Sequence, residues 1–160
     1  MTALDAAQAR FLAEARRAVL ATIDPAGRPR LVPICHVLIE TSAGATLYSP
    51  LDEKPKRVAD PYALGRVRDL LARPQVTVLV DHWDEDWARL AWLRVDGIAR
   101  LLEPGDNSAV AERDAAISAL RAKYPQYRGH DLESRPLIRF DLGHVVGWSS
   151  SDHGASGAGS

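Results

Sequence analysis

The chain has 160 residues, with 20 Lys and Arg against 21 Asp and Glu, so its net charge is −1. A chain of this length fits one domain, and its balanced charge lacks the basic field that nucleic-acid-binding proteins carry. Its single cysteine, Cys35, excludes an internal disulfide and a metal site built from several cysteines. No apolar run of about 18 residues and no signal-like N-terminal segment is present. We therefore expect a cytoplasmic protein that engages neither nucleic acid nor a membrane.

The first part of the chain predicts a helix followed by a β-hairpin. Apolar residues repeat at helical spacing over residues 2–17. Residues 18–23 and 28–40 are expected to form antiparallel strands, because the Asp-Pro-Ala-Gly segment between them has the chemistry of a turn. Pro33 lacks a backbone donor, so it favours an edge strand or a bulge, where a ligand can approach the backbone.

The rest of the chain predicts further strands at 46–49, 75–82, 90–102 and 136–148, and helices at 60–73 and 105–123. Six strands with short turns indicate a mainly β fold, an antiparallel sheet and a small closed barrel with about three peripheral helices. The Ser- and Gly-rich segment 149–160 is expected to be a disordered tail, which leaves residues 1–148 as the folded domain. Neither GxGxxG nor GxxxxGK[ST] is present, so dinucleotide and P-loop chemistry are not indicated.

Five cations between the third and fourth predicted strands form the main candidate for a binding site: Lys54, Lys56, Arg57, Arg66 and Arg68. Residues 66 and 68 point about 200° apart on a helix, so both cannot face one ligand. Arg66 lies near the predicted helix start, where backbone N–H groups and the helix dipole also favour a phosphate. The alternative is a solvated loop whose charges pair locally, for instance Asp52 or Glu53 with Arg57.

Other polar residues support weaker alternatives. His82, Asp84 and Asp86 could ligate a metal, but no second His or Cys pair supports such a site, and we expect none. Trp87 and Trp92 could line a dimer contact or the pocket of a flat ligand.

Cys35 and His36 are neighbours in a predicted strand, so their side chains would point to opposite faces and could not form a nucleophile–base pair. Cys35 fits a small core residue. His36 fits a buried histidine, or a proton donor if its face borders the ligand pocket.

The chain resembles the pyridoxamine 5′-phosphate oxidase-like flavin-binding split barrels in four segments, taken in order: VLATIDPAGRPRLVPIC (19–35), TLYSPLDEKPKR (46–57), LGRVRDLLARPQVTVLVD (64–81) and DEDWARLAWLRVDGIARLL (84–102). The DxKPK loop and the DEDW…WLRVDG stretch are similar, more narrowly, to the branch that uses the deazaflavin coenzyme F-420. The similarity covers roughly residues 10–148.

The resemblance implies a split barrel that forms a homodimer, with two cofactor sites at the subunit interface. It places the family's phosphate-binding lysine on Arg66, and arginine suits phosphate at least as well. Lys54, Lys56 and Arg57 would lie in an enlarged loop able to hold a longer anionic tail. Leu64-Gly65-Arg66 stands where the oxidase has its serine-arginine-lysine signature, which argues against pyridoxamine phosphate as the substrate.

The resemblance also implies that the cofactor ring lies against the second and third strands, at Pro33, Ile34, Cys35, Tyr48 and Ser49. Trp87 and Trp148 are expected at the cofactor, and Trp92 and His36 at the substrate pocket, with the tryptophans reaching over from the partner subunit.

These features indicate an oxidoreductase that uses coenzyme F-420 or FMN to transfer hydride to or from a small organic substrate. The hard chemistry would belong to the cofactor, so no catalytic residue is assigned. The alternative is a non-catalytic protein on the same dimeric barrel that binds flavin, haem or another tetrapyrrole, with His36 or His82 as the candidate axial ligand.

Overall fold

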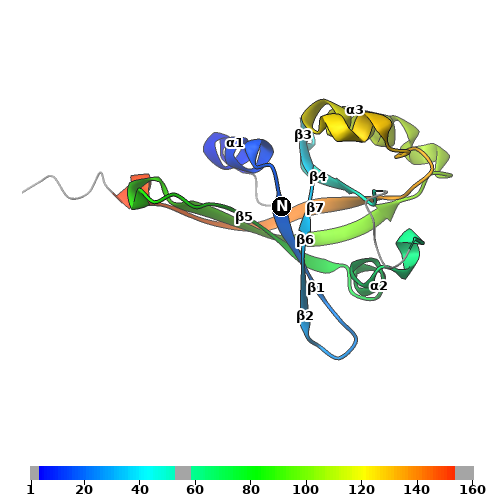
Figure 1. Cartoon of the computed structure of the whole chain (residues 1–160), viewed down its shortest axis with the longest axis horizontal. Coiled ribbons are helices and arrows are strands. Elements are labelled where there is room, and N and C mark those ends of the chain that lie inside the picture. Colours follow the sequence, from blue (N-terminus) through cyan, green and yellow to red (C-terminus); the bar gives the residue numbers. More distant parts are fainter. Residues whose placement is uncertain (1–3, 53–58, 154–160) are drawn as a thin grey trace, which may run out of the picture.

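The computed structural model describes residues 4–52 and 59–153, and its central feature is one curled antiparallel sheet (Figure 1). The strands are β1 (Ala18–Ile23), β2 (Pro29–Ile34), β3 (Val37–Thr41), β4 (Gly44–Pro50), β5 (Gln75–His82), β6 (Ala91–Leu102) and β7 (Leu137–Ser149). Their order across the sheet is β2-β1-β5-β6-β7-β4-β3, and every neighbouring pair is antiparallel. The predicted mainly β, split-barrel fold is therefore confirmed.

The predicted strand over 28–40 is in fact two strands, so the sheet has seven strands instead of six. β2 pairs with β1, whereas β3 pairs with β4 at the other edge of the sheet. Cys35 and His36 join these two edge strands, and no ladder of hydrogen bonds closes the barrel between them. Pro33 lies in edge strand β2 opposite Val19, as its missing donor predicted.

Three longer helices match the predicted ones: α1 (Ala6–Glu14), α2 (Gly65–Ala72) and α3 (Val110–Lys123). α1 packs on β3 and β6, α2 on β1 and β6, and α3 on β3, so each helix covers a separate place around the sheet (Figure 1). The short elements are η1 (Pro61–Ala63), η2 (Trp87–Arg89), η3 (Asn107–Ala109), η4 (Pro125–Gly129) and α4 (Ser150–His153). The structure thus continues past the predicted domain boundary at residue 148, while residues 154–160 lie outside the described residues.

The apolar core has two parts. One part lies between the sheet and helices α1 and α2, and it includes Leu12, Val67 and Phe140. The other part lies beneath α3 and η4, and it includes Ile117 and Tyr127. No helix in the described ranges is both long enough and apolar enough to cross a membrane.

Candidate functional site

Arg66 lies in the first turn of α2, as the sequence predicts. Burial lowers the pKa of its guanidinium, and the charges of Asp52 and Tyr127 act in the opposite direction. The Arg66 Nε is buried and has no hydrogen-bond partner among the described residues. A buried cationic donor without a partner is costly, because it has lost its water and gained nothing in return. An anionic ligand would supply the missing acceptor.

The groups around Arg66 come from three other parts of the chain. Asp52 follows β4 and is buried, and the Tyr127 hydroxyl of η4 donates to Asp52 Oδ2 at 2.7 Å. Burial, together with hydrogen bonds to Cys35 and Asp52, raises the pKa of Tyr127, so its hydroxyl stays protonated. The link between β2 and β3, the end of β4, η4 and the start of α2 therefore meet. We call Cys35, Asp52, Arg66 and Tyr127 the Arg66 corner.

The Arg66 corner fits a phosphate group by two independent features. Arg66 offers a buried N–H donor with no partner in the described part of the chain. Leu64, the residue before α2, provides no side-chain cap to the first turn of that helix, where backbone N–H groups favour an anion. Asp52 has its own donor in Tyr127. The donor set is thus suited to the phosphate of a flavin or deazaflavin.

A buried carboxylate that the sequence analysis missed holds α2 in place. Asp69 is 2% exposed, and its Oδ2 accepts from Thr22 Oγ1 at 2.8 Å and from Arg30 Nε at 2.7 Å. The Arg30 guanidinium lies against Gly65, where an added Cβ would come within 2.7 Å of the Arg30 Cζ. Leu71 of the same helix, although apolar, is 59% exposed. The partners of Asp69 are 47 and 39 residues away, so no local spacing signals them.

The other predicted cations divide into two groups. Arg68 is exposed on α2, in agreement with its predicted direction away from Arg66. Lys54, Lys56 and Arg57 lie outside the described residues, and their part in anion binding stays a prediction.

The residues predicted at the cofactor ring do not all face the same place. Cys35 is half-buried in the Arg66 corner, Ile34 and Ser49 are buried, and Pro33 is exposed on β2. Tyr48 is buried and its hydroxyl donates to Glu112 Oε1 of α3 at 2.7 Å. Because neighbouring side chains on a strand point to opposite faces, the side chain of Tyr48 faces away from that of Ser49.

His36, which was expected at the substrate pocket, is fully buried against α1. Its Nε2 is 2.7 Å from the Leu12 carbonyl, to which it donates, and its own carbonyl accepts from Lys123 Nζ at 2.9 Å. Burial, with a smaller effect of Lys123, lowers the pKa of His36 to about 4. His36 therefore ties the link between β2 and β3 to α1 and α3.

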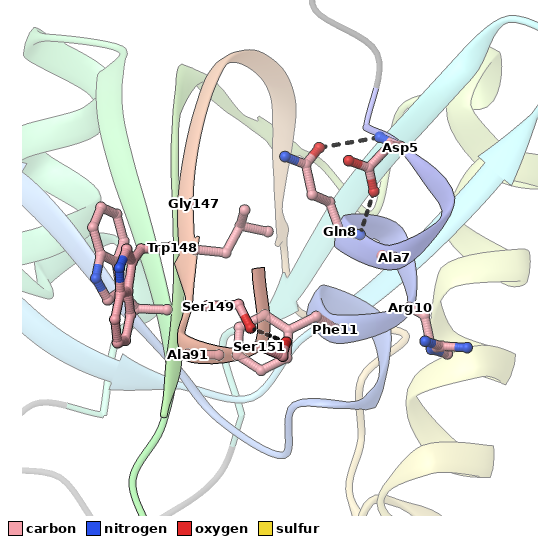
Figure 2. Close-up of a pocket in the computed structure, with 12 residues that line it drawn as sticks. Asp5, Ala7, Gln8, Arg10, Phe11, Ala91, Gly147, Trp148, Ser149 and Ser151 are labelled. Carbon is pink, nitrogen blue, oxygen red and sulfur yellow. Dashed lines mark hydrogen bonds between the residues drawn. The ribbon is translucent and has the colours of Figure 1, made fainter. Parts of the chain in front are cut away.

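Trp92 and Trp148 stand directly opposite each other on β6 and β7. They border a cavity of about 320 Å³ between α1 and these strands, and Figure 2 shows Gln8 and Phe11 reaching from α1 toward β7. Leu93 is buried in the core beside α1, so strand alternation directs the side chain of its neighbour Trp92 to the outer face. In Figure 2 the Trp148 indole likewise lies on the side of β7 away from α1. The two indoles therefore lie on the face of β6 and β7 that is turned away from α1.

The connection between β5 and β6 carries two further exposed indoles. Trp83 is 66% exposed and Trp87 is 69% exposed. His82 Nε2 lies 3.6 Å from Asp84 Oδ2. In the described ranges, no group of three or more His, Cys, Asp or Glu side chains is placed to hold a metal ion.

Comparisons with known proteins agree with this geometry. The family described as pyridoxamine 5′-phosphate oxidase matches residues 4–149. Among solved structures, the fold is similar to that of the conserved hypothetical protein Rv2991 from Mycobacterium tuberculosis, with 18% identity, a TM-score of 0.70, and coverage of 96% of this chain and 89% of the other. An FAD-binding protein from Mesorhizobium loti has 23% identity, a TM-score of 0.64 and coverage of 90% and 94%.

An F420 reductase structure has 17% identity and a TM-score of 0.58, and the match covers 86% of this chain and 94% of that one. No curated protein matches the sequence. At these identities the solved structures show a shared fold, whereas the family match spans nearly the whole chain. The chain belongs to the pyridoxamine 5′-phosphate oxidase-like family of flavin-binding split barrels.

Proposed function

We propose that this protein is an oxidoreductase that binds a phosphate-bearing deazaflavin or flavin, coenzyme F-420 or FMN, and acts on a small organic molecule. The observation that carries this proposal is the buried Arg66 Nε without a hydrogen-bond partner in the described part of the chain. The family membership and the F420 reductase with the same fold support it. When bound, such a cofactor supplies hydride transfer, which no side chain can provide.

The chain's own residues would bind and orient the cofactor. Arg66 would donate to the phosphate, at a place where burial strengthens a charge-assisted hydrogen bond. Asp69 would keep α2, and Arg66 with it, in one position through its bonds to Thr22 and Arg30. Lys54 and Lys56 remain proposed contacts for a longer anionic tail.

We further propose that two copies of the chain complete the site. The indoles of Trp92 and Trp148 lie on the face of β6 and β7 that is turned away from α1. Trp87 is exposed, as an anchor for a partner would be. In a homodimer these side chains would cover the cofactor or substrate of the other subunit.

Cofactor titrations with matched variants of α2 test the phosphate contact. We expect Arg66→Ala to weaken binding of coenzyme F-420 or FMN at least tenfold, because a charge-assisted hydrogen bond contributes about 1.5–3 kcal/mol. Arg68→Ala removes the same charge two residues away on the exposed side, and should leave the affinity within about twofold of the wild type, since exposed charges contribute little. Equal losses in both variants, or none in either, would contradict the Arg66 contact.

The absorbance spectrum of the purified protein distinguishes the cofactors. A deazaflavin, a flavin and a haem have different chromophores, and a sharp Soret band would favour the alternative of a haem- or tetrapyrrole-binding protein. His36 is a poor axial ligand because its Nε2 already donates to Leu12. Turnover of reduced F-420 or FMN with a quinone or conjugated carbonyl then separates an enzyme from a carrier.

A further inference from the structure

A second cavity, lined by none of the four residues of the Arg66 corner, borders β4. It has a volume of about 610 Å³ and opens between the β3–β4 hairpin, β7 and α3. Small-molecule sites in proteins commonly measure about 300–1,000 Å³ and combine apolar walls with a few fixed polar groups. Tyr48 borders this cavity, whereas Ser49 points the other way along the same strand. We call it the α3 cavity.

Small side chains make the walls of the α3 cavity. Ala111 and Ala115 are one helical turn apart on α3, and they face Gly44 and Ala45 of the hairpin. A larger residue at any of these positions would fill the gap between helix and hairpin. Short side chains on both walls therefore leave the space open.

A linked set of charged groups forms the polar side of the α3 cavity. Glu112 Oε1 lies 2.7 Å from the Tyr48 hydroxyl and 2.6 Å from Arg139 Nε. Arg139 NH1 also contacts both carboxylate oxygens of Asp141, at 2.9 and 3.0 Å. These contacts hold Glu112 in one orientation, and its side chain remains 31% exposed, so its carboxylate is accessible to a ligand.

The charges of this set decide which ligand would be recognised. Glu112 and Asp141 carry two negative charges against the single positive charge of Arg139, so the cavity has a net charge of 1 − 2 = −1. An anion would meet two carboxylates, and a neutral donor would bring no positive charge to balance them. A protonated amine would complete the charge balance and donate to the carboxylate of Glu112.

We propose that the α3 cavity is a binding site for a small organic cation, a protonated primary amine on a compact apolar body. The apolar body would lie between Ala111, Ala115 and the β3–β4 hairpin, and the ammonium group would donate to the carboxylate of Glu112. This site is separate from the Arg66 corner, and its occupancy does not depend on a bound flavin or deazaflavin.

Three probes of similar shape and different charge test the proposal: benzylamine, benzyl alcohol and benzoate. Titrations followed by ¹H–¹⁵N NMR of the full chain should show saturable shifts at the amides of Gly44 and Ala115. Benzylamine should bind at least tenfold more tightly than benzyl alcohol, since only the amine carries a positive charge that balances the carboxylates. Benzoate should not bind. Absence of saturable binding by benzylamine, or shifts confined to another part of the protein, would overturn the proposal.

Two variants with a matched control locate the site. Glu112→Gln should reduce the affinity for benzylamine at least tenfold and leave that for benzyl alcohol unchanged. Ala115→Leu should abolish binding of both, because leucine would occupy the cavity, whereas Ala122→Leu is an equal change at an exposed position of α3 that does not border it. Unchanged benzylamine affinity in Ala115→Leu, or an equal loss in Ala122→Leu, would refute the site even if Glu112→Gln folded poorly.

Discussion

The buried His36 should make the protein lose stability as the pH falls from neutral toward 4. Its side chain is fully buried, and the neutral ring donates from Nε2 to Leu12, while Nδ1 is buried without a partner in the described structure. Protonation would place a second N–H and a positive charge where neither water nor an acceptor is available. Burial therefore lowers the pKa of His36 from 6.5 to about 4.

The direction and size of the effect follow from proton linkage. Between the two pKa values the unfolded chain binds a proton at residue 36 that the folded chain does not, so stability falls as the pH falls through this range. A difference of 2.5 in pKa corresponds to about 3 kcal/mol, which is fully lost below pH 4. Between pH 7 and pH 5 the loss amounts to about 2 kcal/mol.

Urea unfolding at pH 7 and pH 5, followed by tryptophan fluorescence, measures this loss. His36→Gln keeps an N–H donor for the Leu12 carbonyl but cannot titrate, so its free energy of unfolding should fall by about 2 kcal/mol less than that of the wild type over this range. His144→Gln removes a largely exposed histidine and should keep the pH dependence of the wild type. If His36→Gln lost as much stability as the wild type, the burial argument would be refuted.

Two further substitutions test how the site is supported. Gly97→Ala would place a Cβ 2.2 Å from the Asp141 carbonyl oxygen, so it should lower the free energy of unfolding by about 2 kcal/mol or more. In Gly105→Ala the added Cβ would have nothing within 4 Å, so the stability should hardly change. Thermal unfolding of the two variants measures this difference. Asp69→Asn removes the charge that Arg30 and Thr22 contact, so we expect a loss of about 2 kcal/mol in urea unfolding together with weaker cofactor binding. Stability lost without any change in cofactor affinity would show that Asp69 does not position Arg66.

Much of the fold could be predicted from local sequence patterns. The turn between residues 23 and 28, the helix that ends before Pro74 and the long strands over 75–82 and 90–102 are marked by turn residues, prolines and β-branched runs. The break at Cys35 and His36 could not be predicted in this way, because residues 28–40 look like one continuous strand. It depends on β2 pairing with β1 and β3 pairing with β4, a choice made by segments far apart in the chain.

The candidate site, like the fold, could be predicted from the sequence only in part. Composition, charge and motif order were sufficient to indicate the family, a cationic anion-binding segment and Arg66 at the start of a helix. Tertiary structure alone decided that Arg66 is half-buried, with an Nε that has no partner among the described residues, and that Asp69 anchors its helix. It also decided that Tyr48 bonds to Glu112 and His36 to Leu12. The physical reason is that burial and hydrogen-bond partnership depend on neighbours brought together by folding, such as Asp52 and Tyr127, which lie 75 residues apart in the chain.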